Sequence, residues 1–219
     1  RIVSASPLWT GARTRQATFA SHHFQIMTTR LFVAARRSAL ALGASVALLP
    51  ASALAQRPDP VGMTRSGPVI QSAGPTVKVD DPTFMIPAGH DFKSVFEINV
   101  GDTATVNQQL VTVARFLNVH VRHGIPKDRV HAAAVIHGSG WMAILSDSAY
   151  GARFAGKANP SRPLVEELLA NGVQLVLCGQ TAGMRGVDRR ELLPGVKLGI
   201  SAMTALNVFQ AQGYQFNPW

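Results

Sequence analysis

The chain has 219 residues, with 21 Lys and Arg against 12 Asp and Glu, and a formal net charge of +9 at pH 7. Six of those basic residues and none of the acidic residues lie in residues 1–55, so the rest of the chain carries a net charge of only +3. No basic stripe with interleaved aromatic residues remains there, and we expect no nucleic-acid partner.

The first part of the chain lacks the pattern of a folded domain. Residues 1–26 have no apolar periodicity, and we expect them to be a disordered, overextended start, with Met27 as the true first residue. Residues 27–55 have a basic beginning and then a short apolar stretch from Ser38 to Leu49. This stretch is shorter than the roughly 20 residues that a membrane-spanning helix needs.

A small-residue motif, Ala53-Leu54-Ala55, follows the apolar stretch. The whole layout is typical of a secretory signal peptide. We therefore expect export by the Sec or Tat route, cleavage near Ala55 and Gln56, and a periplasmic or secreted protein. No stable membrane span should remain after the signal is removed.

Residues 56–92 are rich in Pro, Gly, Ser and Asp, which predicts a linker or an arm that lies over the domain. Short extended pieces are possible at 76–79 and 83–86. Strands and helices then alternate through residues 93–219, the expected folded domain. The sequence predicts strands at 94–100, 130–137, 173–178, 196–200 and 214–216, and helices at 103–123, 162–170 and 201–212.

The sequence leaves two details undecided: which residue caps the first helix, and whether two short segments are loops or helices. Asp102 or Thr103 is expected to cap the first helix, because either side chain can accept from free backbone N–H groups. A loop or short helix is expected around 141–145, and residues 179–187 suggest a helix start or a structured loop. The alternation itself predicts an α/β fold with a parallel sheet and helices on both faces.

In such sheets ligands bind beyond the carboxyl ends of the strands. Three predicted strands end in polar or reactive residues, and these ends should converge on one edge. The candidate substrate-binding residues there are Asn99, Gly138, Ser139, Gly179, Gln180 and Thr181. Gly138-Ser139-Gly140 lacks the Gly-Lys-Ser/Thr ending of a phosphate-binding loop, and we expect no cofactor.

Cys178 is the only cysteine of the chain and the first candidate for chemistry. A thiol where a strand turns into a helix faces free N–H groups and the positive end of a helix dipole, which favour the nucleophilic thiolate. Arg185 could add positive charge if the turn brings it back towards the sulfur. The alternative is a buried, inert thiol, since free cysteine is among the most buried residue types.

His137 ends a predicted strand, and its ring could lie near Cys178 and take the thiol proton. The alternative is a histidine that only shapes its own loop. His120 and His123 could share one face of a helix, but no third ligand has suitable spacing, and we expect no metal site.

The segment CGQTAGMRGV, from Cys178 to Val187, resembles the cysteine segment of the DsrE/DsrF-like family of sulfur-relay proteins. The segments VFEINVGDTATVNQQLVTVARFLN, VIHGSGW and LLPGVKLGISAMTALNVFQAQGYQ resemble the same family, so the similarity extends over roughly residues 93–217. It implies a three-layer α/β/α domain with a mainly parallel sheet of about five strands. It also implies a homo-oligomer, a trimer or hexamer.

The resemblance further implies a sulfurtransferase or sulfur carrier in which Cys178 accepts sulfur as a persulfide and passes it on, with a sulfur donor or acceptor protein or a small sulfur compound as partner. Characterised relay members of the family are cytoplasmic, whereas this chain is expected to be exported. The other reading is a non-catalytic, oligomeric module that binds a small ligand or a partner, with Cys178 packed in the core.

Overall fold

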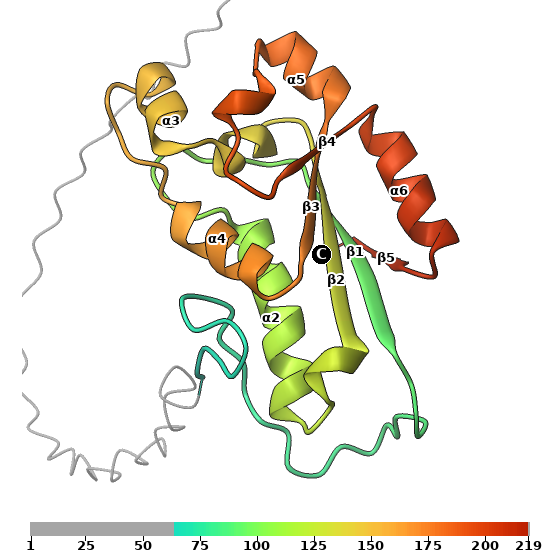
Figure 1. Ribbon diagram of the computed structural model, residues 1–219. Coiled ribbons are helices and arrows are strands. Elements are labelled where there is room, and N and C mark those ends of the chain that lie inside the picture. The colour runs from blue at the N-terminus through green and yellow to red at the C-terminus, as the bar shows by residue number, and fades with distance from the viewer. Residues whose placement is uncertain (1–63, 219) are drawn as a thin grey trace, which may run out of the picture. The chain divides into compact units, whose positions relative to one another are not determined.

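The computed structural model describes residues 64–218, so the expected start and signal peptide lie outside the described residues. Within residues 64–218, five strands form one parallel sheet in the order β4-β3-β2-β1-β5 (Figure 1). The strands are β1 (Phe92–Ile98), β2 (Val130–Ile136), β3 (Gln174–Cys178), β4 (Lys197–Gly199) and β5 (Gln215–Asn217).

Helices lie on both faces of this sheet, which makes the expected three-layer α/β/α architecture (Figure 1). The α-helices are α2 (Gln108–Arg122), α3 (Asp147–Arg153), α4 (Arg162–Ala170), α5 (Gly179–Arg185) and α6 (Ala202–Ala211). Short 3₁₀ turns are η1 (Lys127–Arg129), η2 (Gly140–Ile144) and η3 (Arg189–Glu191). α2 packs on β1 and β2 and against α4, whereas α6 contacts the strands from the opposite face.

The two faces of the sheet are covered unequally. The face under α2 and α4 belongs to the main apolar cluster, which includes Phe96, Leu117 and Leu168. The cluster on the α6 face is small, with Val95, Ala133, Val135, Val176 and Phe209 as its buried members. α6 packs on that face of the sheet and contacts all five strands.

The strand register determines which side chains share a face. Ile98 pairs with Ile136 across β1 and β2, and Ile136 pairs with Leu177 across β2 and β3. Side chains of paired residues in a parallel sheet point to the same face, and successive side chains alternate. The carboxyl ends of β1, β2 and β3 therefore lie side by side on one edge, as expected from the sequence.

The first helix begins later than expected. Residues 103–107 form no helix, and α2 begins only at Gln108. The prediction that Asp102 or Thr103 caps it is wrong, because the Asn107 side chain accepts from the N–H groups of Gln109 and Leu110. The Asp102 carboxylate instead accepts from the Ala104 N–H and stabilises the preceding turn.

The segment after Cys178, for which the sequence suggested either a helix start or a structured loop, is a helix. α5 runs from Gly179 to Arg185 and ends at Gly186, whose left-handed φ of 59° suits a glycine. The short helix expected around 141–145 is the 3₁₀ turn η2. No strand forms at 83–86, where the chain makes bends, and Thr76 makes only a single antiparallel bridge with Arg65.

The segment before β1 is held against α2 and α4. Ile70 is fully buried within the main apolar cluster. The Arg122 guanidinium donates to the carbonyl oxygens of Arg65, Ser66 and Gly67. Residues 64–76 are therefore an arm with its own fixed contacts.

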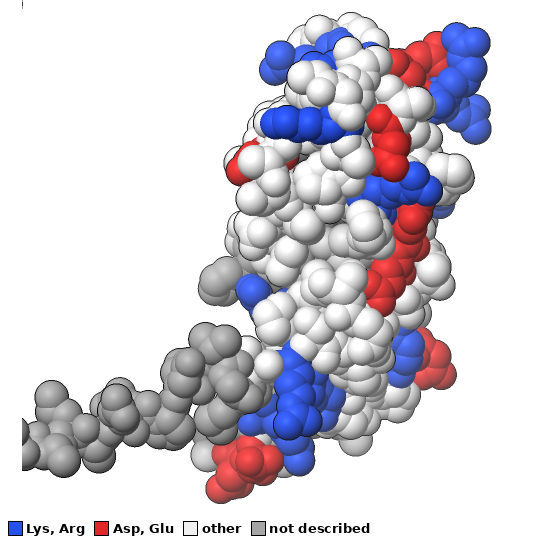
Figure 2. Space-filling view, turned by 90° about the vertical axis from the view of Figure 1, so that its left-hand side faces the viewer, with Lys and Arg blue, Asp and Glu red and all other residues white. Residues whose placement is uncertain are grey.

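Charges of both signs intermingle on the face shown in Figure 2. Among the surface ion pairs, Arg162 pairs with Asp147 at 2.7 Å and with Glu166 at 2.7 Å. Among residues 64–218, no helix has the length and apolar character needed to span a bilayer.

Candidate functional site

Cys178 is the last residue of β3 and directly precedes α5, where the sequence predicted a junction of strand and helix. It is 5% exposed in this chain. In the pairing of β3 with β4, Cys178 lies opposite Gly199, the last residue of β4. The chain therefore brings the beginning of α6, just after β4, next to the beginning of α5.

Polar groups from both helix beginnings surround the sulfur. Burial acts to raise the pKa of the Cys178 thiol, but interactions with the N–H and hydroxyl of Thr181 and the N–H groups of Ala202 and Gln180 outweigh it. The net effect is a thiol pKa below its ordinary value. Cys178 makes no capping hydrogen bond of ordinary geometry, so these N–H groups act on the large sulfur atom mainly through their dipoles. The surroundings of the sulfur therefore make the thiolate easier to form than in an ordinary cysteine.

Gly179 permits the close approach of these two helix beginnings. A β-carbon at this position would lie 2.5 Å from the Gly199 carbonyl oxygen and 3.0 Å from that of Ile200. The Gln180 side-chain amide donates to the same Ile200 carbonyl at 3.3 Å. The contacts of Gly179 and Gln180 therefore hold the two helix beginnings together around Cys178. Both contacts are with backbone carbonyl oxygens of this chain, so they indicate a structural role.

Exposed apolar side chains occur on the elements that surround Cys178. Met184 on α5, Ile200 after β4 and Met203 on α6 are 83%, 75% and 79% exposed. Met184 follows Thr181 on α5, and Ile200 and Met203 lie on either side of Ala202; the N–H groups of Thr181 and Ala202 act on the Cys178 sulfur. Large apolar side chains with such exposure are candidates for contact with another molecule.

Asn99, Gly138 and Ser139 come together, but they are bonded to each other and to backbone groups. The Asn99 carbonyl oxygen accepts from the Ser139 N–H at 2.9 Å, and the Ser139 hydroxyl accepts from the Gly101 N–H at 2.8 Å. Gly138 has a φ of 53°, and a β-carbon there would lie 2.5 Å from the Asn99 carbonyl oxygen. These contacts fasten the loop after β1 to the loop after β2.

Arg185 is not close to Cys178 along the chain's path. It is the last residue of α5, and a continuous helix carries it roughly 9 Å along the axis from its beginning. The segment is a helix and not the turn on which this expectation depended, so a contribution of Arg185 stays a prediction. The positive influence on Cys178 comes from backbone N–H groups.

His137 lies at the end of β2, and its ring has a partner that sequence reasoning missed. The His137 Nε2 atom lies 2.7 Å from the Glu97 Oε1 atom, and the two side chains are 27% and 33% exposed. Glu97 is the one charged residue within an otherwise apolar part of β1 between Val95 and Ile98. A single charged residue within an apolar strand is the sequence signal that indicates such a partner.

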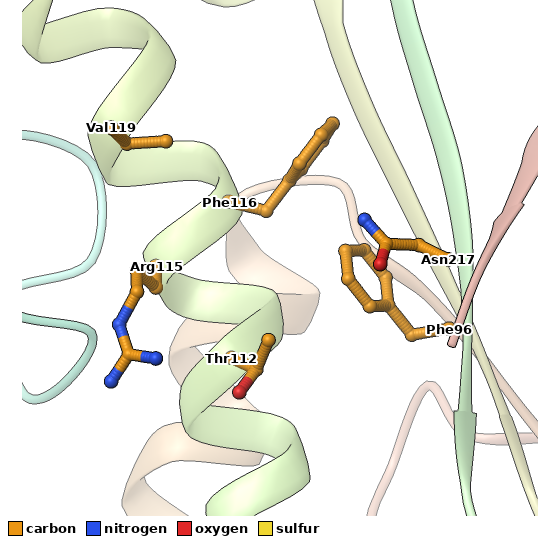
Figure 3. A pocket seen from close by; sticks show the side chains of 6 residues that line it. All are labelled: Phe96, Thr112, Arg115, Phe116, Val119 and Asn217. Carbon is orange, nitrogen blue, oxygen red and sulfur yellow. The ribbon is translucent and has the colours of Figure 1, made fainter. Parts of the chain in front are cut away.

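An apolar cavity of about 350 Å³ lies elsewhere, between α2, β1 and β5 (Figure 3). Figure 3 shows the Phe96 and Phe116 rings facing this space with Asn217 nearby, whereas Arg115 points away. Phe96 points to the α2 face, opposite to Cys178, so the sheet separates this cavity from the thiol. No group of His, Cys, Asp and Glu side chains within residues 64–218 is arranged to hold a metal ion.

Comparisons with known proteins find a matching family and similar solved structures. The family model described as the DsrE/DsrF-like family matches residues 93–217. The protein of unknown function MTH1491 from Methanobacterium thermoautotrophicum is 22% identical, with a TM-score of 0.45, over 59% of this chain and 100% of that chain. The ychN protein from E. coli is 16% identical, with a TM-score of 0.44, over 58% and 99%. No curated protein is significantly similar.

Proposed function

Because the chain belongs to the DsrE/DsrF-like family, we propose that it carries sulfane sulfur as a persulfide on Cys178 and transfers it to an acceptor. The observation that carries this proposal is the place of Cys178 at the end of β3, directly before α5 and beside the end of β4, where N–H groups of two helix beginnings act on its sulfur and lower the thiol pKa. Burial alone would keep the thiol protonated. The N–H groups of two helix beginnings reverse that tendency, and the thiolate is the form that attacks sulfur.

The reaction needs only a persulfide donor. The Cys178 thiolate attacks the outer sulfur of a donor R–S–SH, the S–S bond of the donor breaks, and the donor leaves as R–S⁻. Cys178 then carries –S–SH, and a second thiolate can remove the outer sulfur in the same way. No electron leaves or enters the pair of reactants.

The test is an intact-mass measurement on the protein after incubation with a persulfide donor and removal of the excess. Wild type should gain the mass of one sulfur atom, and dithiothreitol should reverse the gain. Cys178→Ala should gain nothing. A wild type that gains no sulfur, or a Cys178→Ala protein that gains as much, contradicts the proposal.

One observation favours a second candidate, a non-catalytic module that binds a small ligand or a partner. Cys178 is only 5% exposed, which is the burial expected of a packed residue. In that case native Cys178 should resist alkylation at every pH, and Cys178→Ser should change only the stability. A thiol that reacts at neutral pH while the protein remains folded separates the two candidates in favour of sulfur transfer.

We also propose that the protein acts as a homo-oligomer in an exported location. The exposed apolar residues Ile200, Met203 and Val208 around β4 and α6 support self-association. Multi-angle light scattering on the purified protein tests the oligomeric state. N-terminal sequencing of the protein recovered from its producing cells tests cleavage near Ala55.

A further inference from the structure

Glu97 and His137 form an ion pair or hydrogen bond across two neighbouring strands. Glu97 belongs to β1, and His137 follows β2. The Nε2–Oε1 separation is 2.7 Å, and the His137 N–H continues the ladder by donating to the Ile98 carbonyl oxygen at 2.9 Å. Both the ring and its backbone are therefore fixed relative to β1.

The register places His137 level with Cys178. Ile136 pairs with Leu177, so the next residues, His137 and Cys178, are level on adjacent strands. Val135 and Val176, two residues earlier, both belong to the cluster on the α6 face, so His137 and Cys178 also point to that face. Adjacent strands are about 4.8 Å apart, which brings an imidazole within reach of a neighbouring thiol.

We propose that His137, held by Glu97, is the proton acceptor of the Cys178 thiol, with Glu97 as a positioning residue. This inference rests on the proposed sulfur transfer. When the carboxylate accepts from Nε2–H, the Nδ1 atom is left unprotonated and can accept a proton. A nucleophile, a base and a group that orients the base form the usual arrangement of an activated thiol.

Within residues 64–218, the elements on this face carry few other charged groups. α6 (Ala202–Ala211) carries no ionisable side chain. Lys93 and His131 occupy the same face at the beginnings of β1 and β2, several residues from the site. The Lys197 ammonium donates to the Gln174 side chain at 3.0 Å. The remaining charged residues near the strand ends are Asp102 and Arg185, on the loop after β1 and at the far end of α5.

His137 then takes up the thiol proton and later gives it to the departing thiolate, so the transfer needs no other proton donor or acceptor. The thiol proton moves from Cys178 to His137, and the thiolate attacks the outer sulfur of the donor persulfide. The S–S bond of the donor breaks, and the departing R–S⁻ takes the proton from the imidazolium and leaves as R–SH. His137 returns to its neutral form, with Glu97 unchanged.

The experiment measures the rate of Cys178 alkylation by iodoacetamide from pH 5 to pH 10 in wild type, His137→Gln and Glu97→Gln. His131→Gln is the matched control, because His131 lies on the same strand and face, six residues earlier. We expect the midpoint for His137→Gln to move up by about one pH unit, so that alkylation at pH 6.5 slows about tenfold. Glu97→Gln should give a smaller shift in the same direction, and His131→Gln none.

Persulfide loading by mass spectrometry on the same proteins separates the two hypotheses. Slower loading in His137→Gln and Glu97→Gln, with the shifted profiles, supports the inference. Profiles that coincide with wild type overturn it, and loading of wild type would then leave the proposed function intact. Shifted profiles without any loading of wild type overturn the proposed function and leave only the thiol–imidazole pairing. Glu97→Gln keeps the shape of the side chain and one accepting oxygen but removes the charge, so it remains informative if His137→Gln does not fold.

Discussion

The Cα of Gly179 faces the carbonyl oxygen of Gly199 so closely that a β-carbon there would lie 2.5 Å from it. This contact lets the chain after β4 approach α5, and it is that chain that places the Ala202 N–H on the Cys178 sulfur. We expect Gly179→Ala to push the two segments apart, because a backbone oxygen cannot move aside alone. The thiol pKa should then rise, and alkylation of Cys178 at pH 7 should slow by about tenfold.

Gly183, four residues further along α5, is the matched control. A β-carbon there meets nothing within 4 Å. Gly183→Ala should therefore leave the alkylation profile unchanged and stabilise the protein by about 0.5 to 1 kcal/mol in urea unfolding, because Ala favours a helix over Gly. Equal alkylation profiles for both variants would contradict the role assigned to Gly179.

The Thr181 hydroxyl also lowers the pKa of the Cys178 thiol. It acts with the Thr181 N–H to lower the pKa of Cys178 against the effect of burial. Thr181→Val removes the hydroxyl and keeps the shape, so alkylation at pH 7 should slow about fivefold, as expected for the loss of about 1 kcal/mol of hydrogen bonding to the thiolate. Thr181→Ser restores a hydroxyl and should behave like wild type. A Val variant as reactive as the Ser variant rules this contribution out.

The order of strands and helices from residue 93 onward could be predicted because β2 and β3 are continuous apolar runs. A strand that is buried on both faces requires such a run. The junction at Cys178 followed from the apolar residues before it and the small, polar residues after it. The beginning of α2 could not be predicted, because Asp102, Thr103 and Asn107 are all good caps and the choice depends on tertiary contacts.

The candidate site was predictable only in part. Cys178 and His137 carry their own chemical signal, and their strands bring them level. The Ala202 N–H acts on the sulfur only because β4 pairs with β3, a contact between distant segments that no local pattern encodes. The place of Arg185 could not be predicted, because the segment from Gly179 to Arg185 could have been a loop or a helix, and it is a helix.

One buried amide makes five of the hydrogen bonds that hold the arm before β1. The Asn118 side chain accepts from the N–H groups of Val69 and Ile70 at 3.0 and 2.8 Å. It donates to the carbonyl oxygens of Ile70, Ala73 and Gly74 at 2.9, 3.0 and 3.0 Å. We expect Asn118→Ala to lower the free energy of unfolding by about 3 kcal/mol, because several buried backbone groups lose their partner.

The measurement is urea unfolding, combined with limited proteolysis under native conditions. Cleavage within residues 64–79 should become faster in Asn118→Ala than in wild type. Asn207→Ala is the control, because Asn207 is an exposed asparagine on α6. If Asn118→Ala is no less stable than Asn207→Ala, the arm is not held as described.

The contact of the arm with α4 should depend on pH. The Glu167 carboxylate accepts from the Gln71 N–H at 2.6 Å and from the N–H and hydroxyl of Ser72. Partial burial acts to raise the pKa of Glu167, but the hydrogen bonds from Ser72 and Gln71 outweigh it, so the pKa is lowered on folding. A carboxylate with a lowered pKa stabilises the fold fully above its unfolded pKa of about 4.3 and loses this contribution as the pH falls through the folded value.

A comparison of wild type with Glu167→Gln at two pH values isolates this contribution from those of the other carboxylates. At pH 7 wild type should be more stable by about 1 kcal/mol in urea unfolding, the usual contribution of such a hydrogen-bonded group. At pH 3 the difference should shrink towards zero, because the protonated carboxyl resembles the amide. Glu166→Gln, which removes a carboxylate from a surface pair with Arg162, should show a smaller difference at pH 7. A Glu167→Gln difference that is equally large at both pH values would show that the charge of Glu167 does not hold the arm.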